Sequence, residues 1–291
     1  MSPETKCSLV SVDLDRTMIY SKTALGFEID DSVVCVEIYE NGPLSYMTRA
    51  AARSLEALTS SAVVVPTTTR TIEQFRRITL PGAPWRYAIS SNGGNILVDG
   101  KPDRAWRARF ADIELEEIRT ELHTRADGNW VLKRRTADDL FCYLVVEPTE
   151  VPDGFLAEWS QWCAGRGWNV SQQGRKIYTM PDVVSKSRAV AEVLSRAVGD
   201  GELPASAATF AAGDGALDAD MLIAADQAIR PAHGELESMN FQHPGLTVTS
   251  ASGARAGEEI LSWLHERVRA SMEPIRSSVR PTDQGAGSHR V

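Results

Sequence analysis

The sequence predicts an α/β protein built on a parallel β-sheet, with an α+β segment inserted into it. Short apolar runs alternate with helical patterns through residues 8–102 and 181–269. Polar clusters directly follow several of the apolar runs. The segment between these two regions orders its strands and helices differently and holds five of the seven tryptophans. These three observations separate a core from an insertion.

The first part of the core alternates strands and helices. Its apolar runs are four or five residues long, which favours buried strands, and the segments between them repeat apolar residues at helical spacing. The patterns predict strands at 8–12, 62–66 and 87–90, and helices at 48–58 and 71–78.

The inserted segment, residues 103–180, has the character of a separate α+β domain. Its patterns predict helices at 113–125 and 155–165, and strands at 139–146, 168–170 and 176–178. The tryptophans gathered here are expected to form its hydrophobic core. No internal repeat is visible.

The core resumes after the insertion. The patterns predict helices at 187–198, 218–224 and 257–269, a strand at 207–212, and further strand elements at Ile229 and 247–249. We therefore expect a discontinuous core domain of residues 1–102 and 181–270. From residue 271 to 291 the composition shifts to Pro, Ser, Gly and Arg, which predicts a disordered tail.

Composition narrows the function class. Hydrophobic residues make up 43% and charged residues 24% of the chain, as in soluble globular proteins. The formal net charge of -8 argues against an extended nucleic-acid-binding surface, although a small anionic substrate remains compatible with it. The four cysteines lack CxxC spacing, which favours thiols in a reducing compartment over a zinc site or disulfides. With no long apolar span and no signal-peptide pattern, we expect a cytoplasmic protein without a membrane partner.

The most informative motif is Asp13-Leu14-Asp15, directly after the first predicted strand. Successive strand residues point to opposite faces, so the chain must turn at Leu14 for both carboxylates to serve one site. That site would lie at the carboxyl end of the strand, where open α/β sheets bind ligands. Because two close carboxylates repel each other, the motif indicates a hard cation such as Mg²⁺. An isolated motif of this kind is also compatible with a simple acidic turn.

Three more polar clusters follow core elements. Thr67-Thr68-Thr69-Arg70 follows a strand, and its hydroxyls either cradle an anion or cap a helix. Lys186 begins a helix, where the macrodipole disfavours a cation, so it either meets an anion or is simply exposed. Gly213-Asp214-Gly215 ends another strand, and Asp218 follows one helical turn later.

The four clusters, in this order, resemble the motifs of the haloacid dehalogenase-like (HAD) phosphatase superfamily. Asp13-Leu14-Asp15-Arg16-Thr17 is similar to its DxDxT motif, and Gly213 to Asp218 to its GDxxxD motif. Thr68 and Lys186 match the second and third motifs, and Ser91-Asn92-Gly93-Gly94 is similar to the SNGA stretch of the Cof-like branch. The resemblance covers residues 8–102 and 181–269 and implies a Rossmann-like core with an inserted C2-type cap.

The resemblance implies a role for each motif. Asp13 would attack phosphorus and form an aspartyl-phosphate, and Asp15 would act as general acid and then as general base. Thr68 and Lys186 would bind the transferring phosphoryl group. Mg²⁺ would be held by the Asp13 carboxylate, the Asp15 backbone carbonyl and Asp214 of the last motif. Asp218 of the same motif would bind a water of the metal or orient Lys186.

This sequence departs from the superfamily pattern at three positions, because Arg16 and Thr69 replace common glycines and Gly215 replaces a common serine. None removes a group that the implied chemistry needs. We expect Arg16 to be solvated and His233 to have a structural role in its loop.

Substrate selection is expected to lie mainly in the inserted domain. Arg134, Arg175 and Lys176 are candidates for contacting a polar or anionic group of the substrate, although a solvated basic face explains them equally well. Asn92 is expected near the rim of the site.

Together these features predict a Mg²⁺-dependent phosphomonoesterase acting on a small soluble phosphate ester, such as a sugar phosphate or a nucleotide-like metabolite. A phosphomutase shares the same chemistry. A phospho-aspartate signalling domain or a metabolite-sensing relative is the alternative from another class. The oligomeric state is left open by the sequence.

Overall fold

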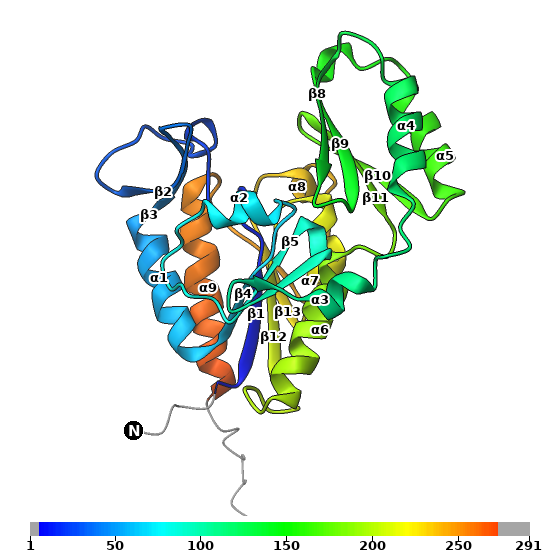
Figure 1. Cartoon of the computed structure of the whole chain (residues 1–291). Helices are drawn as coiled ribbons and strands as arrows, with labels where there is room; N and C mark the ends of the chain where they lie inside the picture. The colour runs from blue at the N-terminus through cyan, green and yellow to red at the C-terminus, as the bar shows by residue number, and fades with distance from the viewer. Residues whose placement is uncertain (1–5, 273–291) are drawn as a thin grey trace, which may run out of the picture.

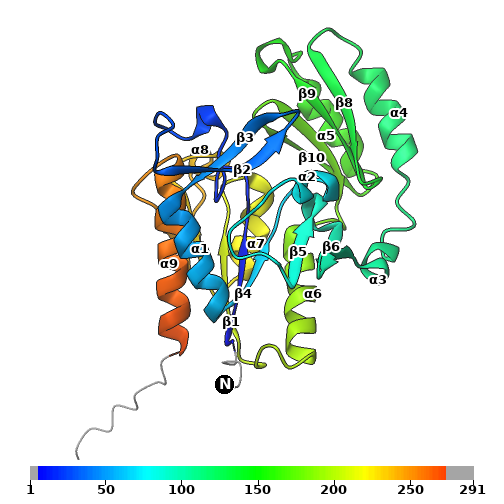
Figure 2. The same ribbon diagram turned by 60° about the vertical axis from the view of Figure 1, so that its left-hand side comes forward.

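Strand β1 (Ser8–Val12) lies inside a five-stranded parallel sheet. The strand order is β14-β13-β12-β1-β4. The other four strands are β4 (Val63–Pro66), β12 (Ala208–Ala212), β13 (Gln227–Arg230) and β14 (Leu246–Val248). This computed structural model describes residues 6–272 and confirms the predicted parallel α/β core with an additional antiparallel domain (Figures 1 and 2).

Helices cover both faces of the sheet. Figure 1 shows α1 (Arg49–Ser61) and α9 (Ala254–Met272) together on one side of the sheet. Because side chains alternate along β1, Val10 and Val12 pack on the face that these two helices cover. Leu9 belongs to the cluster on the opposite face, against α6 (Lys186–Gly199). The short helix α7 (Ala219–Ala224) packs beside α6. The core is therefore a three-layer sandwich.

Hydroxyl side chains begin several of these helices. Thr48 accepts a hydrogen bond from the Ala51 amide at the start of α1, and Ser185 accepts one from the Arg188 amide at the start of α6. Thr71 and Gln74 form a capping box on α2 (Ile72–Arg76). This helix is shorter than the predicted 71–78.

The sheet continues beyond β4 through β5 (Tyr87–Ser90), which meets Thr67 in a parallel bridge. Strands β6 (Asn95–Val98) and β7 (Lys101–Pro102) then extend it antiparallel. The short turn between β5 and β6 is the Ser91–Gly93 helix.

A β-hairpin that the sequence analysis did not predict follows β1. It consists of β2 (Val33–Tyr39) and β3 (Gly42–Thr48), and it stands above the carboxyl ends of the core strands (Figures 1 and 2). Glu40 and Asn41 form its turn with positive φ angles, which matches the right-handed twist of the two strands. We call this element the β2–β3 hairpin.

The inserted domain contains a four-stranded antiparallel sheet in the order β10-β11-β9-β8. Its strands are β8 (Val131–Ala137), β9 (Phe141–Val146), β10 (Trp168–Gln173) and β11 (Lys176–Pro181). Two helices pack with it, α4 (Leu115–Arg125) and α5 (Phe155–Ala164), and α3 (Arg104–Ala108) precedes them. Trp159 is fully buried here, as expected of a core residue.

Two predicted boundaries shift. The strand predicted at 139–146 begins at Phe141, because Asp138 and Asp139 adopt positive φ angles in the β8–β9 turn. The predicted tail 271–291 falls outside the described residues except for Ser271 and Met272, which belong to α9.

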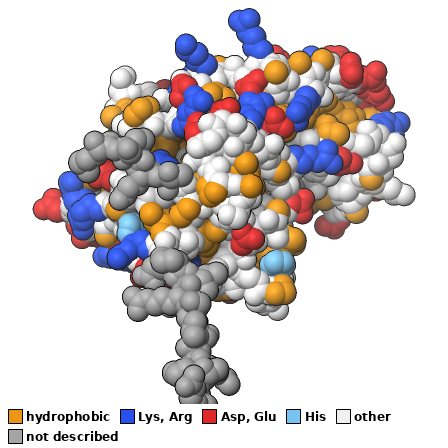
Figure 3. Space-filling view, turned by 90° about the horizontal axis from the view of Figure 1, so that it is seen from below, with side chains coloured by type: hydrophobic (Ala, Val, Ile, Leu, Met, Phe, Trp, Pro, Cys, Tyr) orange, Lys and Arg blue, Asp and Glu red, His pale blue; other side chains and the backbone are white. Residues whose placement is uncertain are grey.

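The remaining short elements connect these layers. They are the 3₁₀ turns Lys22–Ala24, Pro148–Glu150 and Ala216–Asp218, and helix α8 (Glu235–Ser238). The end of the molecule where the strands begin carries interspersed acidic, basic and apolar side chains (Figure 3). Within residues 6–272, every helix is too short or too polar to cross a membrane.

Candidate active site

The first carboxylate pair lies where β1 leaves the sheet. The Asp13 amide still donates to the Ala212 carbonyl, at 2.9 Å, as if continuing the strand. The chain then turns, since the amides of Met18 and Ile19 both donate to the Leu14 carbonyl. This tight loop keeps Asp13 and Asp15 at the carboxyl edge of the sheet.

Lys186 connects this edge with the last motif. It is the first residue of α6, it is 2% exposed, and its Nζ lies 2.6 Å from Asp13 Oδ1 and 2.6 Å from Asp218 Oδ1. Burial alone would lower the pKa of Lys186, but the two carboxylates outweigh it and raise the pKa above its usual value. The lysine is therefore a charged link between two acidic motifs and is not solvent-exposed.

The loop after β12 orients the other acidic residues. Asp218 Oδ2 accepts the amides of Asp214 and Gly215 at 3.1 and 2.9 Å. A Cβ atom at Gly213 would lie 2.5 Å from the Asp218 side chain, so the close approach of Asp218 requires glycine there. The loop thus directs the two carboxylates toward Asp13.

Asp13, Asp214 and Asp218 form one buried acidic group. Each offers a carboxylate oxygen within 4.8 Å of the other two. Burial, followed by repulsion from neighbouring carboxylates, raises the pKa of Asp13 and of Asp214. Lys186 supplies one positive charge against three carboxyl groups. The donor set and its excess negative charge fit a hard divalent cation.

Two further contacts concern this group. Thr17 Oγ1 donates to Asp13 Oδ2 at 3.3 Å, so both oxygens of the Asp13 carboxylate are held. Arg16, which we expected to be solvated, has a 53% exposed side chain and yet lies 3.6 Å from Asp214. His233 bonds the Arg16 carbonyl and the Gly253 amide, in keeping with a structural role.

Asp15 points to a different partner. Its carboxylate, 48% exposed, accepts two hydrogen bonds of 2.7 Å from Nε and Nη2 of Arg70. Its partial burial acts to raise the pKa of Asp15, but the hydrogen bonds and charge of Arg70 outweigh it and lower the pKa. Arg70 was not among the predicted site residues, although it directly follows the three threonines of that cluster.

The threonine cluster lies on the loop after β4. Thr68 is fully buried, its amide donates to the Ile89 carbonyl, and its hydroxyl accepts the Arg70 amide at 3.1 Å. These bonds fix the loop that carries Arg70. Thr69, and not Thr68, is among the residues that line the pocket above the acidic group.

This pocket has a volume of about 560 Å³ and lies between the core and the inserted domain. Asp13, Lys186 and Asp214 are at its core side. The turn between β10 and β11 forms the other side, with Gln173, Arg175 and Lys176, and Tyr178 follows on β11. A small polar ligand fits a pocket of this size and character.

The four candidates for substrate selection separate into two pairs. Arg175 and Lys176 line the pocket. Arg134 and Asn92, which we expected near the substrate and at the rim of the site, are not among the lining residues of this pocket. Arg134 Nη2 bonds the Ala126 carbonyl. Asn92 is 3% exposed, and its Nδ2 lies 3.2 Å from Met180 Sδ and 3.5 Å from the Val184 carbonyl. Asn92 Nδ2 is thus held inside the protein, and Arg134 is an exposed residue that bonds a backbone carbonyl.

Sequence comparison finds no match: no family model matches the chain, and no curated protein matches it. Solved structures do match. The sucrose-phosphatase from Synechocystis sp. PCC6803, solved with sucrose and phosphate, has 15% identity and a TM-score of 0.59 over 89% of this chain and 98% of that one. The C-terminal domain of trehalose-6-phosphate phosphatase from C. albicans has 14% identity and a TM-score of 0.56, covering 90% and 93%.

A third match carries the superfamily name. It is a phosphatase of the haloalkanoate (HAD) enzyme superfamily from Bacteroides thetaiotaomicron, with 15% identity and a TM-score of 0.51 over 92% of this chain and 98% of that one. The chain therefore has the fold of HAD-superfamily phosphatases, core and cap included. Structural similarity at identities this low establishes the fold only. Activity and substrate have to be argued from the residues of the site.

Proposed function

We propose that this protein, which has the fold of the HAD phosphatases, is a Mg²⁺-dependent phosphomonoesterase that uses Asp13 as its nucleophile. The observation that supports this most is the placement of Lys186 Nζ, 2.6 Å from both Asp13 and Asp218, two of the three carboxylates that group with Asp214. A charged lysine among buried carboxylates at the end of a pocket suits a dianionic phosphoryl group.

The proposed reaction has two steps. A carboxylate oxygen of Asp13 attacks phosphorus, the bond from phosphorus to the ester oxygen breaks, and Asp15 gives its proton to the leaving oxygen. Water then attacks the phosphoryl group on Asp13, and Asp15 takes the proton from that water. Inorganic phosphate leaves, and both carboxylates return to their starting state.

Arg70 bears on the protonation of Asp15 in both steps. Its hydrogen bonds lower the pKa of Asp15, which suits the second step, where Asp15 acts as a base. For the first step Asp15 must carry a proton. A bound phosphate ester adds negative charge beside Asp15, and negative charge raises the pKa of a neighbouring carboxyl group.

Three carboxylates would hold the metal, namely Asp13, Asp214 and Asp218, with the Asp15 backbone carbonyl as a fourth oxygen donor. When bound, Mg²⁺ would offset the negative charge of the phosphoryl group and reduce its repulsion from Asp13.

The cap side of the pocket favours a small polar ester. Gln173, Arg175 and Lys176 present an amide and two cations to a volume of about 560 Å³. We propose a sugar phosphate or a nucleotide-like metabolite as substrate. The test is phosphate release from a panel of such esters with Mg²⁺ or EDTA. Conversion to an isomeric phosphate ester without release of phosphate would indicate a phosphomutase instead.

Binding of Mg²⁺ should raise the melting temperature of the protein. The folded-state pKa values of Asp13 and Asp214 lie above their ordinary value of 3.8, so the metal-free protein is most stable when both are protonated, and it loses that stability as pH rises through the raised values. Excess Mg²⁺ should raise the Tm at pH 8 by about 5 °C or more, and by less at pH 5, where protons compete for the carboxylates.

Differential scanning fluorimetry with Mg²⁺ or EDTA at both pH values provides the measurement. Asp214→Asn removes one carboxylate ligand and should reduce the Mg²⁺-dependent gain. An equal gain in this variant, or the same gain at both pH values, would contradict the assignment of the metal site.

Lys176 is expected to contribute to substrate binding. It lines the pocket. Burial acts to lower the pKa of Lys176, but Tyr178 and Asp15 outweigh it and raise the pKa, so the side chain is a cation at the wall of the pocket. Lys176→Ala should raise KM for the preferred ester about tenfold, with a smaller change in kcat, because one charge-assisted contact is lost. Steady-state kinetics on that ester measures both constants.

Lys133→Ala serves as the matched control, since Lys133 is an exposed lysine on β8 of the same sheet. An unchanged KM in Lys176→Ala would assign Lys176 to a solvated basic face.

A further inference from the structure

Glu37 of the β2–β3 hairpin is a buried carboxylate without a part in the proposed reaction. Its side chain is fully buried, whereas its strand neighbours Ile38 and Tyr39 are exposed. Burying a carboxylate is unfavourable unless cations and hydrogen bonds compensate. Its surroundings therefore need an explanation.

An irregularity in β2 turns Glu37 inward. The register between β2 and β3 shifts on both sides of Glu37, between Cys35 and Glu37 and again between Glu37 and Ile38. As a result two consecutive residues, Val36 and Glu37, are both buried, which a regular strand does not allow on one face. β-Bulges commonly redirect a side chain beside an active site.

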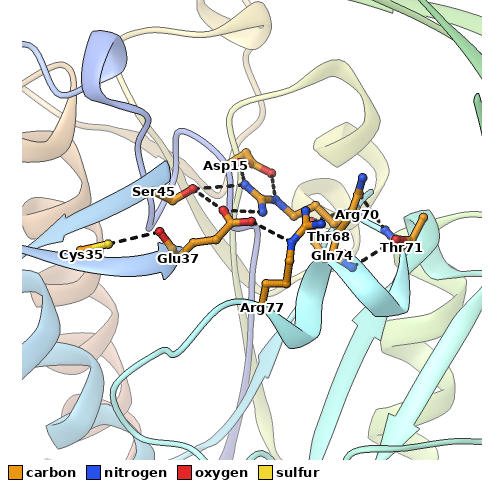
Figure 4. Close-up of polar contacts among 9 residues, drawn as sticks. All are labelled: Asp15, Cys35, Glu37, Ser45, Thr68, Arg70, Thr71, Gln74 and Arg77. Atoms are coloured by element: carbon orange, nitrogen blue, oxygen red, sulfur yellow. Dashed lines mark hydrogen bonds and ion pairs between the residues drawn. The ribbon is translucent and has the colours of Figure 1, made fainter. Parts of the chain in front are cut away.

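The redirected carboxylate joins a cluster of four residues, shown in Figure 4, which we call the Glu37 cluster: Glu37, Ser45, Arg70 and Arg77. Glu37 Oε2 accepts from Ser45 Oγ at 2.5 Å and from Arg70 Nη1 at 2.8 Å. Its other oxygen, Oε1, lies 3.4 Å from Arg77 Nε. Both oxygens therefore face a cation.

Arg70 connects this cluster with the active site. Glu37 holds Nη1, while Nε and Nη2 bond the two oxygens of Asp15 at 2.7 Å each (Figure 4). A guanidinium is planar and rigid, so fixing one nitrogen sets the direction of the remaining donors. Asp15 is 48% exposed, and these bonds to Arg70 determine where its carboxylate points.

We propose that Glu37 is a positioning residue for Asp15, acting through Arg70. The hairpin residue sets the plane of the guanidinium, and the guanidinium holds the carboxylate that exchanges protons with the leaving group and water. This inference rests on the proposed phosphatase function for its kinetic consequence. Its structural consequence, the orientation of Asp15, can be observed without any activity.

The test compares two substrates in the Glu37→Gln variant. Glutamine keeps the size of the side chain. The two oxygens of the Glu37 carboxylate now face Arg70 and Arg77, whereas a glutamine amide has only one oxygen that can accept a hydrogen bond. We therefore expect Arg70 to lose its alignment. The measured constant is kcat/KM, because it reports the steps up to loss of the leaving group and leaves out the later attack of water, which both substrates share. The kcat/KM for an alkyl phosphate such as glycerol 2-phosphate should fall about 30-fold, because its leaving group needs a proton. The kcat/KM for p-nitrophenyl phosphate should fall less than about threefold, because that leaving group needs little help.

Glu73→Gln is the matched control, since Glu73 is an exposed glutamate on α2 that leaves the cluster intact, and it should behave like wild type. Equal losses on both substrates in Glu37→Gln would show that the cluster only braces the hairpin, and no loss on either would also overturn the proposal. If Glu37→Gln does not fold, Arg70→Lys should show the same preference for the aryl ester, because lysine keeps the charge and lacks the fork.

A crystal structure of Glu37→Gln separates this inference from the proposed function. The Asp15 carboxylate should lose its two-point contact with Arg70. An unchanged contact would overturn the positioning role whatever the activity. A wild-type protein that releases phosphate from neither these two esters nor any ester of the panel would contradict the phosphatase function, and the crystal structure would still decide the role of Glu37.

Discussion

Asp13→Asn is expected to abolish phosphate release, lowering kcat by about 10⁴-fold or more, since an amide oxygen is a far weaker nucleophile than a carboxylate. The substitution keeps the size of the side chain and leaves Lys186 paired with Asp218 at 2.6 Å. It also removes a negative charge from a buried group whose pKa is already raised by burial. Phosphate release from the preferred ester, measured with excess Mg²⁺, provides the test.

Stability serves as the control for this variant. Because the Asp13→Asn substitution would relieve repulsion among the buried carboxyl groups, the metal-free variant should unfold at the same temperature as wild type or higher. Substantial remaining turnover in a well-folded Asp13→Asn protein would exclude Asp13 as the nucleophile.

Lys186→Met is expected to have the largest effect on stability. Removing this buried cation leaves Asp13 and Asp218 without their shared partner, and breaking a buried ion pair typically costs about 3–5 kcal/mol. The free energy of unfolding, measured by urea denaturation at pH 7 in EDTA, should fall by that amount. The loss should be smaller at pH 5, because the freed carboxylates can then take up protons.

Arg188→Met is the matched control, since Arg188 is an exposed cation in the same helix. It should change the free energy of unfolding by less than about 0.5 kcal/mol, as most surface substitutions do. If Lys186→Met lowers the free energy of unfolding by less than about 1 kcal/mol, the ion pairs of Lys186 with Asp13 and Asp218 do not stabilise the buried group as proposed.

The core was predictable because its signals are local. Apolar runs such as 62–66 and helical spacing such as 257–269 depend only on neighbouring residues. The carboxyl ends of parallel strands meet at one edge, so motifs that follow β1 and β12 come together without any further information. This explains why Asp13 and Asp214, 201 positions apart in the numbering, could be assigned to one site.

The β2–β3 hairpin was missed although it carries a signal. Asn41-Gly42 at the end of a β-branched run is a typical hairpin sequence. The inward direction of Glu37 carries no such signal, because it depends on where the register of the two strands shifts.

Long-range side-chain contacts account for the remaining differences. Arg70 meets Asp15 across 55 positions, and Asn92 meets Met180 across 88, and neither pairing leaves a pattern in the sequence. For the same reason, the sequence does not show which basic residues of the cap line the pocket and which do not. Arg134 and Lys176 are both basic residues on strands of the cap sheet, and the folded sheet places Lys176 at the pocket while Arg134 bonds the Ala126 carbonyl.

The measurement that tests the phosphatase mechanism most directly is mass spectrometry of the protein quenched in acid during turnover of its best phosphate ester. If Asp13 is the nucleophile, the peptide that contains residues 13–15 carries a phosphoryl group during turnover and loses it when substrate is exhausted. The same peptide from Asp13→Asn remains unmodified. Release of phosphate at full rate with no phosphoryl group on Asp13 at any time would contradict the mechanism.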